Sequence, residues 1–485
     1  MVNFKLINKI LGQLLFIEAT LMVLCLVMSF LYKEDDLFGF LISFILTILM
    51  ATILRYHGHD AKNSLSRRDA YMVVSLTWVV FSFMGAMPFL VSGYITNFTD
   101  AFFEAMSGFT TTGATIVSDV ERFPHGLLFW RSMSQWVGGL GIVFFTIALL
   151  PSLVGGSTRI FSAEMTGPIR TKLHPRLSTT AKWIWSIYIF LTLACTASYL
   201  LCGMNPFDAV NYAMTTTATG GFAPHNSVQQ AFSTPSIQYV CVLFCFLAGM
   251  NFSLLYYSFS KLRFGALFKN AEFRLYFWSI VGFSLTVGAI LFFQSGYGLE
   301  HAFRSGLFQV VTFVTSTGLF NEDTSTWPHV TWIILAICMF MGASSGSTSG
   351  GIKCIRVVML LKNIRNEFSQ MIHPNAVLPL KINGQHVEGN KRYTLLAFLT
   401  AYLLICLIAG TFILASGVDA ENTGTILLSC MSNVGLSLDQ NLGPRMTWVM
   451  LPDTVKWLCV SLMLIGRLEI FTVLILFSPN FWKKN

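Results

Sequence analysis

Long apolar stretches recur along almost the entire chain, and they decide what it can fold into. They lie near residues 10–32, 37–55, 71–92, 126–150, 183–202, 237–259, 275–294, 331–342, 394–416 and 455–478. Most are long enough to cross a hydrocarbon core of roughly 30 Å, which takes about 20 helical residues. Since only 11% of the 485 residues are charged and 54% are hydrophobic, the sequence predicts an all-α polytopic membrane protein.

Positive charge gathers in alternate loops. Lys and Arg cluster at 55–68, 159–182, 261–274 and 353–392, whereas acidic groups lie at 34–36, 119–121, 322–323, 419–421 and 439. Because cytoplasmic loops carry the excess of Lys and Arg, this alternation predicts that both termini are cytoplasmic. Membrane topology thus accounts for the net charge of +8, and we expect membrane lipid around the chain and no nucleic-acid partner.

Four short polar strips interrupt the apolar sequence. They are "GFTTTGATI" (108–116), "TTTATGGF" (215–222), "TSTGLF" (315–320) and "SNVGLSLD" (432–439). Aligned on Gly113, Gly220, Gly318 and Gly435, they define a unit that repeats about every hundred residues. The segments 101–113, 306–318 and 423–435 align without gaps, whereas 209–220 needs one deletion.

Each unit consists of an apolar span, a short amphipathic segment, a strip and a second span. The short segments cannot cross the bilayer and are predicted to be re-entrant helices. Since irregular backbone at membrane depth must be buried or line a water-filled path, we expect four tandem helix–re-entrant pore helix–helix repeats around a central pore. Residues 1–68 would add two N-terminal transmembrane helices, and the repeats would occupy 69–180, 181–272, 273–390 and 391–485.

Thr, Ser and Gly at the end of a re-entrant helix suit a pore that binds K⁺. Their carbonyl oxygens can replace the hydration shell of the ion, and the carboxyl end of each helix favours a cation. Glycine provides the positive φ that such a turn needs. A single strip would more often be a packing face of small residues, but four in register favour the pore.

The second span of the third unit breaks at "MGASSGSTSGGIK" (341–353). We predict that this break is a flexible gate beneath the strips, because the other three units show no such interruption. A hinge of small residues that packs against a neighbour is the alternative.

Two charged residues, Arg467 and Glu469, lie inside the last apolar span. Intramembrane charges indicate function by default. We expect Arg467 to face the pore below the strips and Glu469 to contact a neighbouring helix. Arg131 and Gln135 are expected to brace the strips from behind by hydrogen bonds.

The strips, together with "FWRSMSQWVGGLGI", "GASSGSTSGGIK" and "GRLEIFTVLILFSPNFW", resemble the Trk/Ktr/HKT superfamily of potassium transporters. The resemblance implies a homodimer in the bacterial inner membrane, with one pore per protomer. It also implies a cytosolic TrkA-like regulatory ring that binds NAD and ATP/ADP. K⁺ would be the bound substrate, and this chain would carry no organic cofactor.

The resemblance also assigns roles to residues. The K⁺ selectivity filter would comprise Thr110, Thr111, Thr112, Gly113, Thr217, Ala218, Thr219, Gly220, Thr315, Ser316, Thr317, Gly318, Ser432, Asn433, Val434 and Gly435. The gating loop would comprise Gly342, Ala343, Ser344, Ser345, Gly346, Ser347, Thr348, Ser349, Gly350 and Gly351. Arg467 would be the charge in the pore. The fourth strip, "SNVG", departs from the Thr-rich pattern of the others.

Two alternatives to a gated channel-like pore stay open. A symporter that couples K⁺ to H⁺ or Na⁺ is disfavoured, because apart from Glu469 the central spans contain almost no acidic or histidine side chains. An enzyme is disfavoured more strongly. His57 and His59 lie together on a basic loop, but the sequence shows no nucleophile or metal-binding motif.

Overall fold

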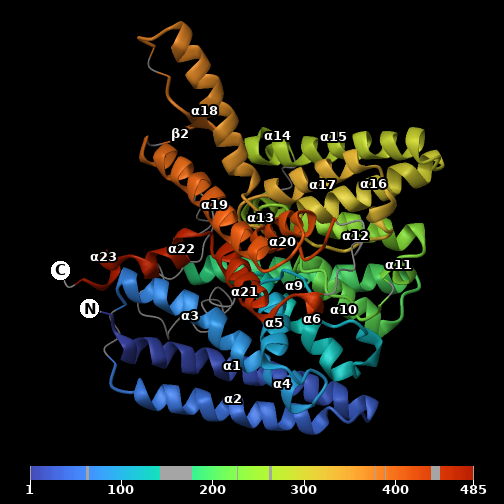
Figure 1. The fold of residues 1–485 in the computed structure, drawn as a ribbon, viewed down its shortest axis with the longest axis vertical. Coiled ribbons are helices and arrows are strands. Elements are labelled where there is room, and N and C mark those ends of the chain that lie inside the picture. The colour runs from blue at the N-terminus through green and yellow to red at the C-terminus, as the bar shows by residue number, and fades with distance from the viewer. Residues whose placement is uncertain are drawn as a thin grey trace.

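The computed structural model describes residues 2–61, 65–141, 177–226, 228–260, 265–376, 378–387, 389–438 and 448–483. These form helices and one short hairpin, which confirms the predicted all-α class (Figure 1). Several predicted features lie outside the described residues. They are the second half of the span 126–150, Asp439, and the basic residues Lys62, Arg159, Arg170, Lys172, Arg176, Lys261 and Arg263.

Two long antiparallel helices, α1 (Phe4–Tyr32) and α2 (Leu37–His57), lie side by side before the first repeat (Figure 1). The acidic turn between them contacts the amino end of α6 (His125–Gly139). Glu34 accepts a hydrogen bond from the His125 N–H at 2.6 Å and contacts its ring nitrogen Nδ1 at 2.7 Å. A carboxylate is favourable at this end of a helix because the exposed N–H groups carry partial positive charge.

The first two repeats follow. The first contains α3 (Arg67–Gly85), α4 (Met87–Val91), α5 (Phe98–Phe109), η1 (Val120–Arg122) and α6. The second contains α9 (Leu177–Leu201), α10 (Pro206–Thr217), α11 (Val228–Ala231), α12 (Pro235–Ala248), α13 (Phe252–Ser260) and α14 (Gly265–Lys269).

The third repeat contains α15 (Ala271–Gln294), α16 (Leu299–Val314), η2 (Thr324–Thr326), α17 (His329–Met341) and α18 (Cys354–Ile372). The antiparallel hairpin β1 (Lys381–Ile382) and β2 (Gln385–His386) leads to the fourth repeat. That repeat contains α19 (Gly389–Ala415), α20 (Ala420–Ser432), η3 (Trp448–Met450), α21 (Asp453–Arg467), α22 (Phe471–Leu474), η4 (Ile475–Phe477) and α23 (Pro479–Trp482).

The four re-entrant helices α5, α10, α16 and α20 share one design. Each carries an acidic residue in its first turn, and these are Asp100, Asp208, Glu300 and Glu421. Asn97 and Asn205 also cap α5 and α10 with their side chains. The acids complement the positive amino ends, and the carboxyl ends with their partial negative charge lead directly into the polar strips.

Two expected spans are broken in the structure. Within the described residues, six helices are long and apolar enough to cross a membrane by themselves. The expected span 237–259 instead forms α12 and α13, bent by 100°, and 455–478 forms α21 and the segment Phe471–Phe477, bent by 111°. Both predictions of a continuous span were therefore wrong: the chain bends sharply within each apolar stretch.

Candidate functional site: the polar strips and the loop beneath them

All four re-entrant helices end in the same hydrogen-bonded turn. In α5, the Thr111 N–H donates to the Gly108 carbonyl at 3.0 Å, and the Thr112 N–H donates to the Ser107 carbonyl at 2.9 Å. Equivalent pairs of bonds, between 2.8 and 3.4 Å, close the other three helices. This is the Schellman pattern, in which the residue after the cap adopts a left-handed conformation and the chain turns away from the helix axis.

The left-handed residue of each turn is not a glycine. The four residues are Thr111 (φ 54°), Thr219 (φ 53°), Ser316 (φ 54°) and Asn433 (φ 53°). Such a conformation costs roughly 1–2 kcal/mol for an L-residue. Its recurrence in all four strips indicates that the strained turn is retained for its position, since strain of this kind clusters at functional sites.

A positive-φ glycine follows two residues later in every strip, and these glycines join the strips into a closed ring. A Cβ on Gly113 would lie 2.2 Å from the Gly220 carbonyl oxygen, and one on Gly221 would lie 2.1 Å from that of Thr317. A Cβ on Gly318 would lie 2.1 Å from the Val434 carbonyl oxygen, and one on Gly435 would lie 2.2 Å from that of Thr112. The strips therefore surround one axis in the order of the repeats.

The ring corrects the alignment of the second strip. Its left-handed residue is Thr219 and its positive-φ glycine is Gly221, so the strip equivalent to Thr110–Gly113 is Ala218–Gly221 rather than Thr217–Gly220. In this register 209–221 aligns with 101–113 without the deletion that we expected. The two adjacent glycines allow either alignment in the sequence, and only the backbone conformation distinguishes them.

Two cavities lie on either side of the loop Gly342–Gly351 and the strips. One, of about 150 Å³, is lined by the glycines Gly113, Gly221, Gly318 and Gly435 together with Arg131, Phe222 and His225. The strips therefore converge on a single mouth. Within the described residues, no hydrogen-bond donor reaches the carbonyl oxygens of Thr111, Ser316 or Asn433. Buried carbonyls of this kind are suited to a cation or water.

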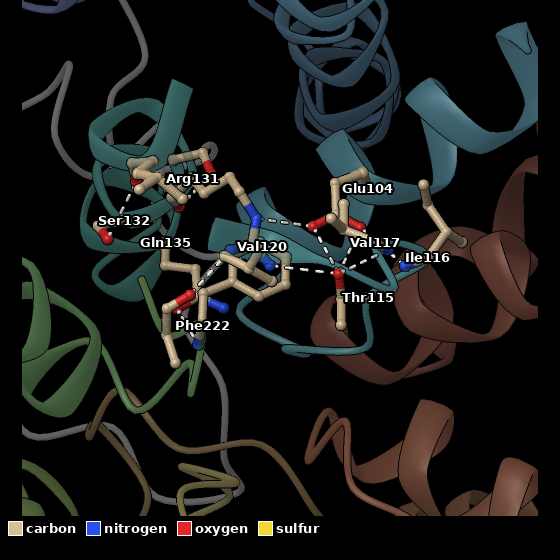
Figure 2. A network of polar contacts seen from close by, with 12 residues as sticks. Glu104, Thr115, Ile116, Val117, Val120, Arg131, Ser132, Gln135 and Phe222 are labelled. Atoms are coloured by element: carbon tan, nitrogen blue, oxygen red, sulfur yellow. Dashed lines mark hydrogen bonds and ion pairs between the residues drawn. The ribbon is translucent and has the colours of Figure 1, made fainter. Parts of the chain in front are cut away.

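Arg131 and Gln135 brace the strips from behind, as predicted (Figure 2). Gln135 donates from Nε2 to the Gly220 carbonyl at 2.7 Å and accepts from the Phe222 N–H at 3.0 Å. Arg131 donates to the Ala223 carbonyl at 2.9 Å, and its guanidinium carbon lies 4.2 Å from the centre of the Phe222 ring.

Sequence reasoning missed the partner of Arg131. Glu104, in the middle of α5, accepts from Arg131 Nε at 2.9 Å and from the Ile116 N–H at 3.0 Å (Figure 2). Both side chains are almost fully buried. Thr115 also donates to Glu104, so the carboxylate fixes the chain that leaves the first strip. The only signal in the sequence is a single acid within the apolar run "AFFEAM" (101–106).

The loop Gly342–Gly351 lies directly against the strips. The Gly350 N–H donates to Ser316 Oγ at 2.6 Å, and Thr219 Oγ1 lies 3.2 Å from Thr348 Oγ1. A Cβ on Gly350 would lie 2.1 Å from the Ser432 carbonyl oxygen. The loop therefore contacts the second, third and fourth strips at their left-handed turns or directly beside them. Glycine is required at position 350 because a side chain there would collide with the Ser432 carbonyl.

The second cavity, of about 80 Å³, lies against the loop rather than against the strip residues. Its walls include Ser347, Ser349, Gly350, Lys353, Arg467 and Glu469. The loop thus separates this cavity from the mouth formed by the glycines.

The prediction that only the third unit is interrupted is wrong, because the second spans of the second and fourth units are broken as well. The second helices of the four repeats all end near the strips: α6 at Gly139, α12 at Ala248, α17 at Met341 and α21 at Arg467. Glycines allow these ends to pack closely: a Cβ on Gly138 would lie 1.8 Å from the Phe109 carbonyl oxygen, and one on Gly466 2.5 Å from that of Met431. The third repeat differs in the length and contacts of its loop.

Arg467 lines the cavity below the loop, and carbonyl groups hold its guanidinium. Nη1 donates to the Thr348 carbonyl at 2.8 Å, and Nη2 donates to the carbonyls of Gly138 and Gly139 at 2.7 Å each. Arg467 thus links the loop to the carboxyl end of α6. Glu469 forms an ion pair with Arg356 at the start of α18, whose guanidinium carbon lies 4.1 Å from the Phe398 ring centre.

The fourth strip differs from the others because Asn433 serves two contacts. Its amide nitrogen donates to Thr112 Oγ1 at 2.9 Å and to the Met463 carbonyl at 3.0 Å. Asparagine also adopts the left-handed conformation more readily than other non-glycine residues. Asn433, which distinguishes "SNVG" from the Thr-rich strips, therefore links the fourth strip to the first strip and to α21.

The described residues contain no group of three or more His, Cys, Asp or Glu side chains that could hold a metal ion. His59 contacts Asp60 at the exposed surface, as expected for a solvated loop.

Known proteins resemble the chain over its whole length. A family described as TrkH, cation transport protein, matches residues 37–484. The Trk system potassium uptake protein TrkH of Halomonas elongata is 34% identical over 489 residues, which cover 99% of this chain and 100% of that protein. TrkG of Escherichia coli K12, also a Trk system potassium uptake protein, is 31% identical and covers 99% of both chains. The crystal structure of the potassium transporter TrkH from Vibrio parahaemolyticus superimposes with a TM-score of 0.87 at 32% identity, covering 99% of this chain and 100% of the other.

Proposed function

The chain belongs to the TrkH family of cation transport proteins, and from this premise we propose that it takes up K⁺, and also Rb⁺, through a gated K⁺-selective pore in the bacterial inner membrane. Membership of a transport family agrees with the expectation that the chain is not an enzyme. The observation that carries the proposal is the closed ring of four strips around one mouth.

Selectivity would come from backbone dipoles. The carbonyl oxygens of Thr110–Gly113, Ala218–Gly221, Thr315–Gly318 and Ser432–Gly435 would replace the hydration shell of K⁺. The four helix ends add partial negative charge on the same axis. Glu104, the carboxylate behind the first strip, is committed to Arg131, so it supports the strip rather than the ion.

The loop Gly342–Gly351 would be the gate. Its contacts with Ser316 and Thr219 close the path between the mouth and the inner cavity. Arg467, which holds the loop at Thr348, would place a positive charge in the cation path. Opening would require these bonds to break.

The same proposal includes a homodimer and a cytosolic TrkA-like ring that binds NAD and ATP/ADP. Support comes from the names of the relatives, which place them in a Trk system, and from the shape of the third repeat. The helix α18 and the hairpin project away from the helix bundle and offer a surface to a partner (Figure 1). Both termini lie on one side, which we assign to the cytoplasm.

The proposal is tested by Rb⁺ uptake into liposomes that contain only this chain and are loaded with K⁺. We expect uptake driven by the K⁺ gradient alone and blocked by external K⁺ but not by Na⁺. Uptake that began only after a proton or sodium gradient was imposed would contradict a passive pore.

A substitution in the ring sharpens this test. Gly113→Ser should lower the preference for Rb⁺ over Na⁺, because Gly113 has φ 82° and a side chain would collide with the Gly220 carbonyl. Gly93→Ser is the matched control, since Gly93 has φ 78° but no atom within 4 Å of its Cβ position. An unchanged preference in Gly113→Ser would show that the filter assignment is wrong.

Symport with H⁺ remains the second candidate, and one observation favours it. Glu18, in the membrane-spanning helix α1, is fully buried, and both of its carboxylate oxygens lack a hydrogen-bond partner within the described residues. Unpaired intramembrane carboxyls are typical of proton-coupled carriers. If uptake followed the proton gradient and Glu18→Gln abolished that dependence, symport would replace the passive pore.

A further inference from the structure

Glu272, in the first turn of α15, holds one end of the loop Gly342–Gly351. Its Oε1 accepts from the Ser345 N–H at 2.5 Å, and its Oε2 accepts from Ser345 Oγ at 3.1 Å. The side chain is 5% exposed. Glycine and serine give this loop many alternative conformations, so a buried carboxylate that binds both groups of Ser345 selects one of them.

The amino end of α15 that carries Glu272 is itself held by the hairpin. The Ala271 N–H donates to Asn383 Oδ1 at 2.8 Å. Asn383 (φ 50°) and Gly384 (φ 81°) form the two-residue turn between β1 and β2, a conformation for which Asn-Gly is the preferred pair. One side chain of the turn therefore accepts the first N–H of the helix, next to the N–H of Glu272 that Asn270 caps.

The hairpin also contacts the helix that follows the loop. Leu380 and Ile382 form a buried apolar cluster with Ile355 and Met359 of α18. Lys362 Nζ, further along α18, donates to the Lys381 carbonyl at 2.7 Å. Since α18 begins at Cys354, three residues after the loop ends, the hairpin touches the structures that anchor the loop at both of its ends.

We propose that the hairpin Lys381–His386 sets the position of the loop, with Glu272 as the positioning residue between them. The inference rests on the proposed role of the loop as the gate. A displacement of the hairpin removes the Asn383 cap from α15 and shifts the start of α18. Both changes release Ser345 from Glu272, and the loop then withdraws from Ser316 and Thr219. The hairpin lies on the side of both termini, where a regulatory partner would reach it (Figure 1).

The test compares Rb⁺ flux through variants of the complete chain in liposomes without a partner. Glu272→Ala and Asn383→Ala should each raise flux severalfold and leave the preference for Rb⁺ over Na⁺ unchanged. The Rb⁺ flux of the double variant should not exceed that of Glu272→Ala, because both substitutions break the same series of contacts between the hairpin and the loop. Arg274→Ala is the matched control, since Arg274 is exposed on the same turn of α15. The proposal would be overturned if Glu272→Ala had the same Rb⁺ flux as the unsubstituted chain. It would also be overturned if the increase in flux of the double variant were the product of the two single increases.

A second readout does not depend on transport. Ser347 lines the cavity below the loop, and a thiol reagent should modify Ser347→Cys slowly while the loop is held. Adding Glu272→Ala should raise the rate of modification, measured against the parent chain with its native cysteines. If Glu272→Ala does not fold, Ser345→Ala replaces it, because it removes only the 3.1 Å contact. An unchanged rate of Ser347→Cys modification would refute the positioning role of Glu272, even if the chain carried no Rb⁺. If the rate of modification increased but Rb⁺ flux was lost, the positioning role would stand and only the proposed function would be contradicted.

Discussion

At the scale of single residues, the buried ion pair behind the first strip should be the costliest to break. Glu104→Gln leaves the Arg131 guanidinium without its carboxylate in a place that water does not reach. Removal of one partner of a buried pair typically costs about 3–5 kcal/mol. We therefore expect a lower free energy of unfolding by about 3 kcal/mol or more, together with a weaker preference for Rb⁺ over Na⁺, because the single oxygen of glutamine cannot accept from both Arg131 Nε and the Ile116 N–H.

The matched control for this variant is Glu367→Gln. Glu367 accepts from Arg392 at 3.0 Å, but the two side chains are 53% and 31% exposed. Exposed pairs contribute at most about 1 kcal/mol, so thermal or denaturant unfolding should change little. If Glu104→Gln and Glu367→Gln lowered the free energy of unfolding equally, burial of the pair behind the strip would not explain its contribution to stability.

His225 should make uptake depend on the outer pH. Its Nε2 lies 2.8 Å from Asp208 and its Nδ1 3.8 Å from Glu121, at the mouth that it shares with Arg131. The hydrogen bond to Asp208 raises the pKa of His225 from its ordinary value of 6.5, with a smaller contribution from Glu121, although burial opposes the shift. The ring therefore stays protonated above pH 6.5 and loses its positive charge as the pH rises through the raised value.

Deprotonation leaves the carboxylates of Asp208 and Glu121 without a neighbouring cation, so we expect Rb⁺ influx to increase as the outer pH rises from about 6 to 8.5. His225→Asn should flatten this dependence. His301→Asn serves as the control, because His301 also contacts a carboxylate, Glu322, but does not line the mouth. A pH profile that survives in His225→Asn would assign the titration to another group.

The sequence predicts the strips but not their exact register or their support. A glycine after a short amphipathic segment indicates the turn, whereas the left-handed Thr111 and Thr219 give no such signal, because β-branched residues rarely adopt that conformation. The choice between Gly220 and Gly221 depends on which of them lies against the Thr317 carbonyl, and that neighbour is about a hundred residues away. Glu104 was missed for the same reason, because its partner Arg131 belongs to another helix.

At the scale of elements, the junction after α21 links a charged side chain to the loop Gly342–Gly351. Arg467→Ala removes three hydrogen bonds to carbonyls and a positive charge from the inner cavity. We expect Rb⁺ flux to increase severalfold. Arg467→Lys separates the two contributions. Its ammonium group keeps the positive charge but lacks the two Nη groups with which the guanidinium binds Thr348 and the end of α6 at the same time.

If the Rb⁺ flux of Arg467→Lys is as high as that of Arg467→Ala, the lost hydrogen bonds to Thr348 and α6 explain the increase. If it stays as low as in the unsubstituted chain, the lost charge explains it. A strong loss of flux in Arg467→Ala, together with a lower melting temperature, would show instead that Arg467 supports the fold.

Element boundaries follow from the sequence only where composition changes. The ten small residues from Gly342 to Gly351 mark the interruption after α17. The bends after α12 and α21 lie within largely apolar sequence, where Gly249 and Asn251 mark the first and Gly466, Arg467 and Glu469 mark the second. These few residues leave the mean hydropathy of each stretch high, so hydropathy alone predicts a continuous span.

At the scale of the whole molecule, the two ends of the helix bundle carry opposite charge. The acidic turn at Glu34 and the acidic residue Glu322 lie at the end where α1 and α15 finish. The helix α18, which carries Arg356, Lys362 and Arg365, lies at the end with both termini (Figure 1). Since cytoplasmic surfaces carry the positive excess, the end with the termini should face the cytoplasm.

Two glutamines at opposite ends make this orientation measurable. Gln294, the last residue of α15, and Gln370, near the end of α18, are both exposed. In intact cells, a membrane-impermeant thiol reagent should modify Gln294→Cys, and Gln370→Cys should react only after the membrane is opened. The parent chain sets the background, because eight of its ten cysteines are buried and the other two are only half-buried. Because the re-entrant helices all enter from the end of Gln294, the reverse labelling pattern would place the mouth of the strips inside the cell, and K⁺ uptake would then begin at the loop rather than at the ring of glycines.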